Sequence, residues 1–429
     1  MTFFFISLFM LLVFWRPQEW LVPFLYGLPI LDAVFYLSLL TLFLEIREGR
    51  IRFPRGAPQI LLLAGLFFAA LMSHIAHTYF QGMLDTIIPS LKFCVFTLVL
   101  FIALDRPARL LFVARMFVFM ACFMAVHALL QQARGYGFAF HRPFFVGTHH
   151  RSTFFGIFED PNDLSQMLAA SIPFAFVVTR RRSSLSVLLG IGITVLLVYG
   201  VLATGSRGGL VGLAAAGAMM VATVLPSRWL PYYMALLVTG FLVACPLAGG
   251  LLDESAHDRV VFWGTANWYF KTNPLFGVGS GMMIEYMPKG RAIHSAYVSC
   301  YTEMGVFGYW FWFGLLQVGI LGSWRARVAF RDPNTYDQLW LKRFAGMAIA
   351  AMVSFAAAGY FLSRAFVYPL FFLFALLGAV PVVANRMTDG EPIPVALRGK
   401  DYALLTAGSL ASIAYVYLSI LLLNRVWYG

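Results

Sequence analysis

Long apolar runs recur from one end of this chain to the other, separated by short polar segments. Most of them approach the roughly 17–25 residues that a helix needs to cross a bilayer. The runs predict membrane-spanning helices over residues 2–15, 27–46, 58–75, 91–104, 111–133, 163–179, 185–203, 208–225, 229–250, 296–322, 344–362, 366–384 and 403–423. The first run is short, but it has neither a basic leader nor a small-residue cleavage site, so we interpret it as a retained span. The pattern therefore predicts an all-α polytopic membrane protein with about 12–13 transmembrane helices.

Basic residues indicate how these spans are oriented, because short cytoplasmic loops are enriched in Lys and Arg. Basic side chains cluster in the segments 47–55, 180–182 and 325–343. Placing these segments inside the cell predicts a cytoplasmic N-terminus and an outer C-terminus. The chain is accordingly predicted to lie in a bacterial inner membrane.

Two loops on the predicted outer face are longer than the rest, 134–162 and 251–295. Loops of more than about 12–15 residues are usually functional or disordered, and the aromatic, glycine and charged content of these two favours order. The second loop is predicted to contain an amphipathic helix of about four turns. The acidic pair Asp253 and Glu254 marks its start, and Pro274 follows its end. Its aromatic residues predict a position at the lipid interface. The expected organisation is one transmembrane domain, 1–429, with two periplasmic loops.

Composition supports the membrane assignment and narrows the partners. Apolar residues make up 61% of the chain and charged residues only 12%, whereas an ordinary globular chain has about 25% charged residues. The net charge is +12, and basic cytoplasmic loops explain that sign better than nucleic acid does. The expected partner is therefore the lipid bilayer and not nucleic acid. The four cysteines lack C-x-x-C spacing and predict neither disulfides nor a zinc site.

Topology does not explain the basic residues that this orientation places on the outer face. They are Arg16, Arg134, Arg142, Arg151, Arg207, Arg259, Lys271, Lys289, Arg291, Arg364 and Arg425. Each one alone could be a solvated or snorkelling charge at the interface. As a group, gathered mostly in or beside the two long loops, they predict an anionic partner on that face.

Arg207 has the most unusual setting, in ATGSRGGL between two apolar runs. A tight turn there is expected to hold the guanidinium at membrane depth, where an unpaired charge is costly. The start of the next helix offers free N–H groups to an anion, and Arg binds phosphate oxygens bidentately. A lipid diphosphate is the predicted ligand, and the alternative is that the small residues serve helix packing alone. Arg259, expected in the first turn of the loop helix where a cation opposes the helix dipole, predicts a second contact unless Asp258 neutralises it.

All eight histidines fall on the predicted outer face or in the outer half of a span, and none falls in an inner loop. Histidine titrates near neutral pH and is readily used as a base. His294 is the best placed, because it follows the glycine-rich run GVGSG and the cations Lys289 and Arg291 and then opens a span. A purely structural histidine at the mouth of a span is the alternative. No metal is expected, since the carboxylates in FEDPNDLS suit capping of the following helix better than cation binding.

These residues carry a resemblance to a known family. The segments GIFEDPNDLSQ, ATGSRGGL, RVVFWGTANWYF with NPLFGVGSG, and HSAYVSCYTEMGVFG follow one another over roughly residues 130–310. In this order on a polytopic chain they resemble the bacterial O-antigen ligase family, which includes O-antigen polymerase-like members. The opening WRPQEW also resembles the exosortase-associated branch of these ligases.

The resemblance implies a membrane glycosyltransferase of the GT-C type that is metal-independent and inverts the anomeric centre. It implies that Arg207 and Arg259 hold an undecaprenyl-diphosphate-linked glycan donor, and that His294 activates an acceptor hydroxyl. The implied acceptor is lipid A core or a similar acceptor at the periplasmic face, and no cofactor is implied. Family members often have Asn after this His, whereas Ser295 follows it here, which puts the orientation of the acceptor in question.

The other cations of the two loops are possible supporting residues for the same site. They are Arg142, Arg151, Lys289 and Arg291. Three other functions stay open: an O-antigen polymerase, a protein O-oligosaccharyltransferase, and a transporter or flippase for anionic lipids. The last of these predicts charges near mid-membrane and an internal repeat, whereas the outward cations lie mostly at the outer rim and no repeat is found.

Overall fold

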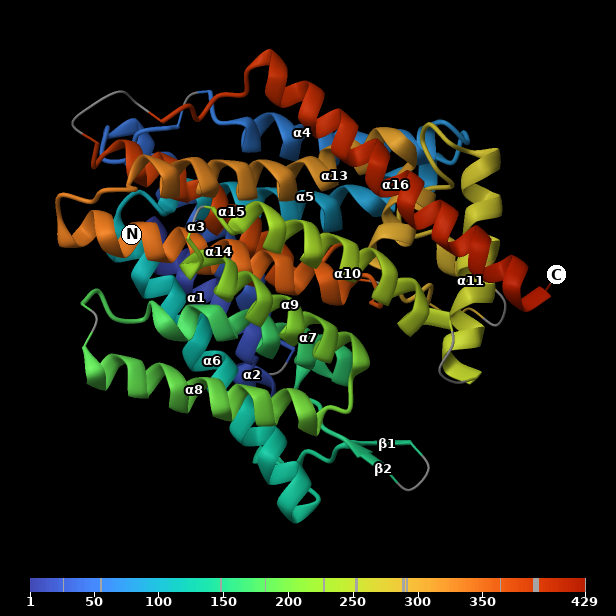
Figure 1. The fold of residues 1–429 in the computed structure, drawn as a ribbon, viewed down its shortest axis with the longest axis horizontal. Helices are drawn as coiled ribbons and strands as arrows, with labels where there is room; N and C mark the ends of the chain where they lie inside the picture. Colours follow the sequence, from blue (N-terminus) through green and yellow to red (C-terminus); the bar gives the residue numbers. More distant parts are fainter. Residues whose placement is uncertain are drawn as a thin grey trace.

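The structure is a bundle of long helices, most of which run in a similar direction (Figure 1). It is a computed structural model that describes residues 1–25, 27–54, 56–146, 149–181, 183–226, 228–250, 254–287, 290, 292–362, 364–388 and 393–428. The α-helices are α1 (Thr2–Trp15), α2 (Pro17–Trp20), α3 (Ile30–Arg47), α4 (Pro58–Ile75), α5 (Phe80–Ala103), α6 (Pro107–Arg134), α7 (Pro161–Ser171), α8 (Ser184–Ala203), α9 (Arg207–Val224), α10 (Leu230–Gly250), α11 (Glu254–Thr272), α12 (Met283–Tyr286), α13 (Ala296–Ala329), α14 (Tyr336–Gly359), α15 (Tyr368–Asn385) and α16 (Gly399–Tyr428). Short 3-10 helices are η1 (Pro23–Leu25), η2 (Phe138–Phe140), η3 (Gly156–Phe158) and η4 (Ile172–Phe176), and the strands β1 (Phe144–Val146) and β2 (His149–Arg151) form a small antiparallel hairpin.

Every predicted span overlaps a helix, and the predicted fold class, an all-α polytopic membrane protein, is confirmed. Within the described ranges, nine helices are long and apolar enough to cross a membrane, while α1 and the first part of α10 are apolar but shorter. One predicted span, 163–179, is wrong as a continuous helix. There α7 ends at Ser171 and a 3-10 turn follows, because Pro173 lacks the N–H that an α-helix would need.

The centre of the bundle is formed by α14 and α15, most of whose length is buried, whereas α8 and α9 are exposed along most of theirs. Small residues let α9 pack tightly on α14. Gly208, Gly212 and Ala216 recur at intervals of four and are buried, and Ser354 Oγ of α14 donates to Gly212 O over 2.8 Å. This is the small-residue packing that is common between membrane helices, where close backbone approach replaces the hydrophobic driving force.

Helix α13 is broken near its start. Gly305 has φ 65° and ψ −170°, which no helix contains. The segment before α12 fills the break: Val306 N donates to Pro274 O over 2.8 Å, and Gly279 N donates to Glu303 O over 3.0 Å. The backbone groups that the break frees are therefore satisfied by the protein itself, as an apolar environment requires.

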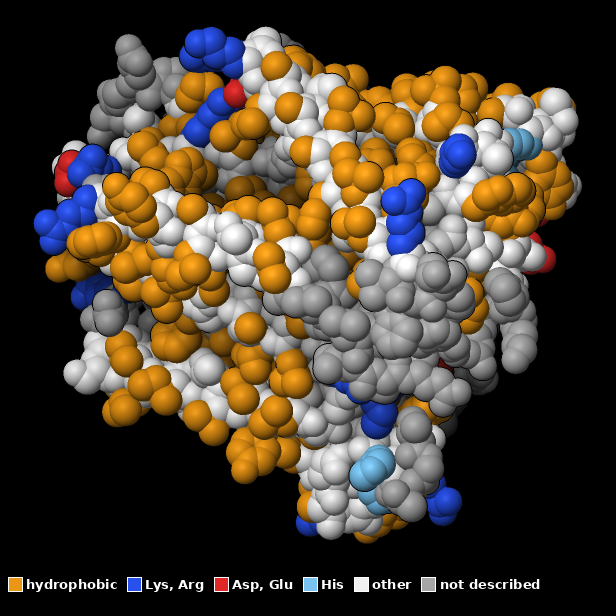
Figure 2. Space-filling model, turned by 45° about the vertical axis from the view of Figure 1, so that its right-hand side comes forward, with side chains coloured by type: hydrophobic (Ala, Val, Ile, Leu, Met, Phe, Trp, Pro, Cys, Tyr) orange, Lys and Arg blue, Asp and Glu red, His pale blue; other side chains and the backbone are white. Residues whose placement is uncertain are grey.

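Both long loops lie at the same end of the bundle, which we call the loop end. The β1–β2 hairpin and α11 are both at the right-hand side of Figure 1. Figure 2 shows hydrophobic side chains over much of the flank of the bundle, and a group of Lys and Arg side chains at its left margin. This distribution fits helices that face lipid along their sides and water at their ends.

The aromatic face of α11 does not lie where the sequence predicts it. Trp263 is completely buried, and Phe262 and Phe270 are also buried against the protein, whereas Trp268 is exposed. The helix therefore uses most of its aromatic residues to dock on the bundle instead of on lipid.

Candidate functional site

A polar network holds the start of α9 at the loop end. Ser206 caps the helix by accepting from Gly209 N over 3.2 Å, and its hydroxyl donates to Asn162 Oδ1 over 2.7 Å. The same Asn162 oxygen accepts from Arg151 Nη2 over 3.0 Å, and Arg151 Nε donates to Thr204 O over 2.9 Å. The hairpin strand β2 and the α8–α9 turn are thereby locked together, with the guanidinium of Arg151 beside the first turn of α9.

Arg207, the first residue of α9, lies close enough to Arg151 for the two charges to interact. Burial lowers the pKa of the Arg151 guanidinium, the carboxylate of Asp160 raises it, and the charge of Arg207 lowers it again. Two cations therefore share the N-terminal end of one helix. Such a helix end with adjacent cations favours an anion.

Two sequence-based expectations about Arg207 are wrong. Its side chain is exposed instead of enclosed between two helices, because the α8–α9 turn ends at the surface of the bundle. The neighbouring glycines serve packing: a Cβ on Gly208 would touch Phe361 Cβ at 3.4 Å, and one on Gly209 would collide with Ser165 Oγ. Both glycines thus lie close against neighbouring helices.

Arg259 is half-buried in the second turn of α11, one turn later than predicted. Its neighbour Asp258 has a side chain that lies outside the described residues. Asn424 Nδ2 of α16 donates to Val260 O over 3.1 Å, so the part of α11 around Arg259 is held against the bundle.

His294 is half-buried immediately before α13, whose N-cap is Ser295. Its φ of 56° lies in the left-handed region, where non-glycine residues are uncommon and which stores conformational strain. The preceding carbonyl, Ile293 O, accepts from Trp263 Nε1 of α11 over 2.7 Å. The backbone at His294 is thus tied directly to the helix that carries Arg259.

The elements that carry Arg207, Arg259 and His294 meet around the end of α14. Tyr360, just past α14, packs its ring against Trp263 of α11 at 5.6 Å between ring centroids and against Tyr297 of α13 at 6.4 Å. The next residue, Phe361, lies against Gly208 of α9. The residues that contact Tyr360 and Phe361 each lie within four positions of a predicted site residue: Trp263 of Arg259, Tyr297 of His294, and Gly208 of Arg207. The fold therefore brings the three elements together at one place.

The remaining predicted residues divide into described and undescribed ones. Arg142 is exposed in the loop beside the hairpin, and Lys289 and Arg291 lie outside the described residues. The carboxylates of FEDPNDLS have structural roles: Asp160 caps α7 by accepting from Asn162 N over 2.7 Å, and Asp163 Oδ1 accepts from Arg364 Nε over 2.9 Å. In the part of the chain that the structure describes, no group of three or more metal-ligating side chains occurs.

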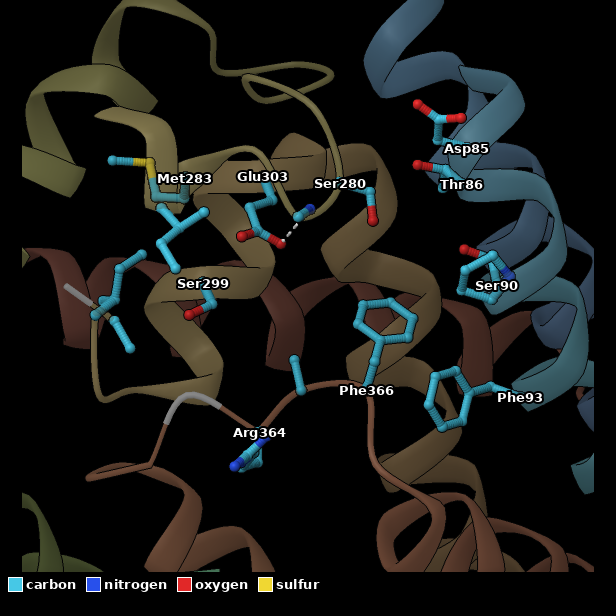
Figure 3. A pocket seen from close by; sticks show the side chains of 16 residues that line it. Asp85, Thr86, Ser90, Phe93, Ser280, Met283, Ser299, Glu303, Arg364 and Phe366 are labelled. Carbon is cyan, nitrogen blue, oxygen red and sulfur yellow. Dashed lines mark hydrogen bonds between the residues drawn. The ribbon is translucent and has the colours of Figure 1, made fainter. Parts of the chain in front are cut away.

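A cavity of about 440 Å³ opens beside the segment that leads to His294. Figure 3 shows its two walls, one formed by α5 and the other by the first part of α13. Its polar lining consists of Asp85, Thr86, Ser90, Ser280, Ser299, Glu303 and Arg364, and its apolar lining includes Phe93, Ile293 and Phe366. A second cavity of about 300 Å³ shares Phe93, Arg364 and Phe366 with it, so the two adjoin.

The comparison with protein families bears directly on this end of the bundle. Residues 192–313 match the family model described as O-antigen ligase. We call residues 192–313 the ligase domain after this match. The family predicted from the motifs is thereby confirmed, and no curated protein matches the chain. The matched range contains Arg207, Arg259 and His294 and extends past the break in α13, whereas Arg142 and Arg151 lie before it.

Sequence reasoning missed the lining of the larger cavity, including a carboxylate inside the ligase domain. Glu303 belongs to the long apolar run 296–322, and an ionisable residue within a span marks a functional position by default. That signal was available in the sequence. Asp85 had no comparable signal, because the predicted span began only at residue 91, whereas α5 begins at Phe80.

Proposed function

We propose that this O-antigen ligase-like protein transfers a glycan from undecaprenyl diphosphate to a hydroxyl of lipid A core, or of a similar acceptor. The transfer takes place at the periplasmic face of the inner membrane, which is the loop end. The observation that carries the proposal is the meeting of α9, α11 and the start of α13 within a domain that matches O-antigen ligases. It supports a site in which two arginine-bearing helix turns and a histidine act on one substrate.

In this mechanism Arg207 and Arg259 bind the diphosphate, and Arg151 supports Arg207. The acceptor hydroxyl oxygen attacks the anomeric carbon from the face opposite the diphosphate. The bond from that carbon to the phosphate oxygen breaks, and its electron pair leaves with the diphosphate. The cations stabilise the negative charge that grows on the leaving oxygen, which is the largest contribution in many transfer reactions.

His294 takes the proton of the attacking hydroxyl. A positioned general base contributes about 10²–10⁴-fold to the rate. The anomeric configuration is inverted because attack and departure occur on opposite faces. Neither a metal nor a nucleotide takes part in this scheme, because the diphosphate is already a good leaving group.

The test uses the full chain in vesicles with an undecaprenyl-diphosphate-linked glycan, with and without lipid A core, followed by mass measurement of the products. We expect transfer to lipid A core. We expect Arg207→Ala and His294→Ala to lower transfer by at least about 10²-fold while the protein stays folded. Matched controls are Arg331→Ala and His149→Ala, which alter exposed residues outside the proposed site.

Each other outcome points to a different function. Elongation of the lipid-linked glycan without lipid A core indicates a polymerase, and glycan on an added protein indicates a protein glycosyltransferase. Movement of the lipid across the vesicle membrane without a new glycosidic bond indicates a transporter and refutes the proposal. Transfer by His294→Ala at the wild-type rate refutes its role as the base.

A further inference from the structure

The cavity of about 440 Å³ has a chemistry opposite to that of the cation-bearing turns. Its lining carries two carboxyl groups, Asp85 and Glu303, together with several hydroxyl groups. Its only described cation, Arg364, is already paired with Asp163, at 2.5 Å between Nη2 and Oδ2. A diphosphate binds best among available cations, so the described lining suits a different ligand from the one assigned to Arg207 and Arg259.

Several polar groups of the cavity are held in place by hydrogen bonds to neighbouring residues. Glu303 Oε2 accepts from Gly281 N over 3.0 Å, as the dashed line in Figure 3 shows. Thr86 Oγ1 is 2.9 Å from His74 Nε2, within hydrogen-bond distance, and Ser280 N donates to Ser73 Oγ over 3.0 Å. Groups held in this way lose little freedom when a ligand binds, which is the arrangement expected of a binding site.

The cavity fits a sugar in both size and lining. Its volume lies within the roughly 300–1,000 Å³ that is typical of small-ligand sites. Carboxylate and hydroxyl oxygens accept hydrogen bonds from sugar hydroxyls, and the rings of Phe93 and Phe366 lie at one side of the cavity to cover an apolar sugar face. The adjoining smaller cavity gives room for a further sugar unit.

The position of the cavity relative to His294 indicates which sugar it holds. Ala292 and Ile293 line the cavity, and the carbonyl of Ile293 is bonded to Trp263 of α11. The short segment ending at His294 therefore separates the cavity from the helix that carries Arg259. An acceptor in the cavity and a diphosphate on the cationic side would meet at this histidine.

We propose that the cavity between α5 and the broken start of α13 binds the acceptor sugar, and that Glu303 and Asp85 select an acceptor without phosphate or carboxylate groups near the attacking hydroxyl. This inference rests on the proposed transfer reaction. Glu303 binds the acceptor in this scheme and does not replace His294 as the base. Donor sugars have the same hydroxyl chemistry, so the test must separate the two substrates.

The experiment measures transfer by the full chain in vesicles, with the undecaprenyl-diphosphate-linked glycan as donor. The acceptor is a lipid-anchored disaccharide prepared in a neutral form, a form with one amino group and a form with one phosphate monoester. We expect the wild-type protein to use the first two forms at least about tenfold better than the third, since placing like charges side by side disfavours binding on that scale or more. Equal use of all three forms overturns the charge selection.

The variants Glu303→Gln and Asp85→Asn identify the substrate that the cavity holds. Glu303→Gln is expected to raise the KM for the neutral acceptor about tenfold or more, with the KM for the donor unchanged. Asp85 is exposed near the start of α5, so Asp85→Asn is expected to fold normally and to raise the same acceptor KM several-fold. The matched control Glu285→Gln removes an exposed carboxylate of α12 and leaves both KM values unchanged.

The outcomes keep the two proposals apart. If wild-type protein transfers glycan but Asp85→Asn and Glu303→Gln both keep the wild-type acceptor KM, the cavity is not the acceptor site and the transfer reaction stands. If these variants raise the donor KM instead, the cavity holds the donor sugar and the inference is wrong. If wild-type protein transfers glycan to none of the acceptors, including lipid A core, the transfer reaction itself fails.

Discussion

Replacing Gly305 with alanine is expected to destabilise the ligase domain through both its backbone conformation and its close contacts. Its φ of 65° and ψ of −170° lie in a region that is essentially restricted to glycine, and a side chain there costs about 1–3 kcal/mol. A Cβ would also lie well inside 3.0 Å of Leu275 O. Moving that carbonyl breaks the bond from Phe307 N at 3.1 Å, which contributes about 0.5–1.5 kcal/mol. The combined loss is about 1.5–4.5 kcal/mol.

Two glycines supply controls that separate these causes. Gly135, the C-cap of α6, has φ 77° with open space around it, so Gly135→Ala carries only the left-handed backbone cost of about 1–2 kcal/mol. Gly217 lies within α9 and also has open space, so Gly217→Ala is expected to stabilise the protein by about 0.5–1 kcal/mol.

The assay is thermal unfolding in detergent, followed by tryptophan fluorescence. The expected order of unfolding temperatures is Gly217→Ala at or above wild type, then Gly135→Ala, then Gly305→Ala. The last variant should unfold roughly 3–18 °C below wild type, from about 2–4 °C per kcal/mol for long chains. If Gly305→Ala and Gly135→Ala unfold at the same temperature, the loop does not pack against the break as described.

Two further predictions concern charged groups at the loop end. Arg364→Gln leaves the buried carboxyl of Asp163 without its ion partner and is expected to lower the free energy of unfolding by about 1–3 kcal/mol. The double variant Asp163→Asn with Arg364→Gln should recover part of this loss. Equal unfolding temperatures of the single and double variants would contradict the pairing. Burial lowers the pKa of His141 below its usual value near 6.5, although Glu159 opposes the shift. The unfolded loop therefore binds a proton more readily than the folded loop, and loop stability falls as the pH drops below about 6.5. Hydrogen exchange of residues 137–141 should accelerate from pH 7.5 to about pH 5, and a pH-independent protection of these amides would show that His141 is not linked to loop folding.

The helices were predictable because a membrane leaves few alternatives. An apolar run of sufficient length must satisfy its backbone groups internally, and only a helix does so without a partner. The helix over 254–272 was also predictable, because acidic residues and Pro274 mark its two ends. Its orientation was not, since a ring such as that of Trp263 suits lipid and a protein core equally well. The choice depends on Tyr360 and Ile293, which are distant in sequence.

The sequence predicted which residue types form the candidate site. It predicted neither the exposure of Arg207 nor the cavity beside α5. The turn at Arg207 was correctly placed between two helices, but only the packed bundle shows that this turn reaches the surface. Arg151 lies beside Arg207 because it donates hydrogen bonds to Asn162 and Thr204. These two residues come from separate elements, so the sequence alone does not predict this arrangement. The cavity depends on α5 beginning at Phe80, eleven residues before the apolar run that predicted it; Asp85 lies in that added stretch.

The glycine-rich run NPLFGVGSG shows how one local feature serves both fold and site. Its spacing resembles loops that cradle phosphates, but here Gly277 faces α13, because a Cβ there would collide with the backbone of Glu303. The run, which we call the strap, therefore fills the break in α13 at Gly305. There Val278 N donates to Thr302 O over 2.9 Å. Because the same strap ends with the amide that holds Glu303, any change that lifts it from the break also releases the carboxylate in the cavity. Loss of stability and loss of acceptor binding should therefore occur together in strap variants and separately in Glu303→Gln.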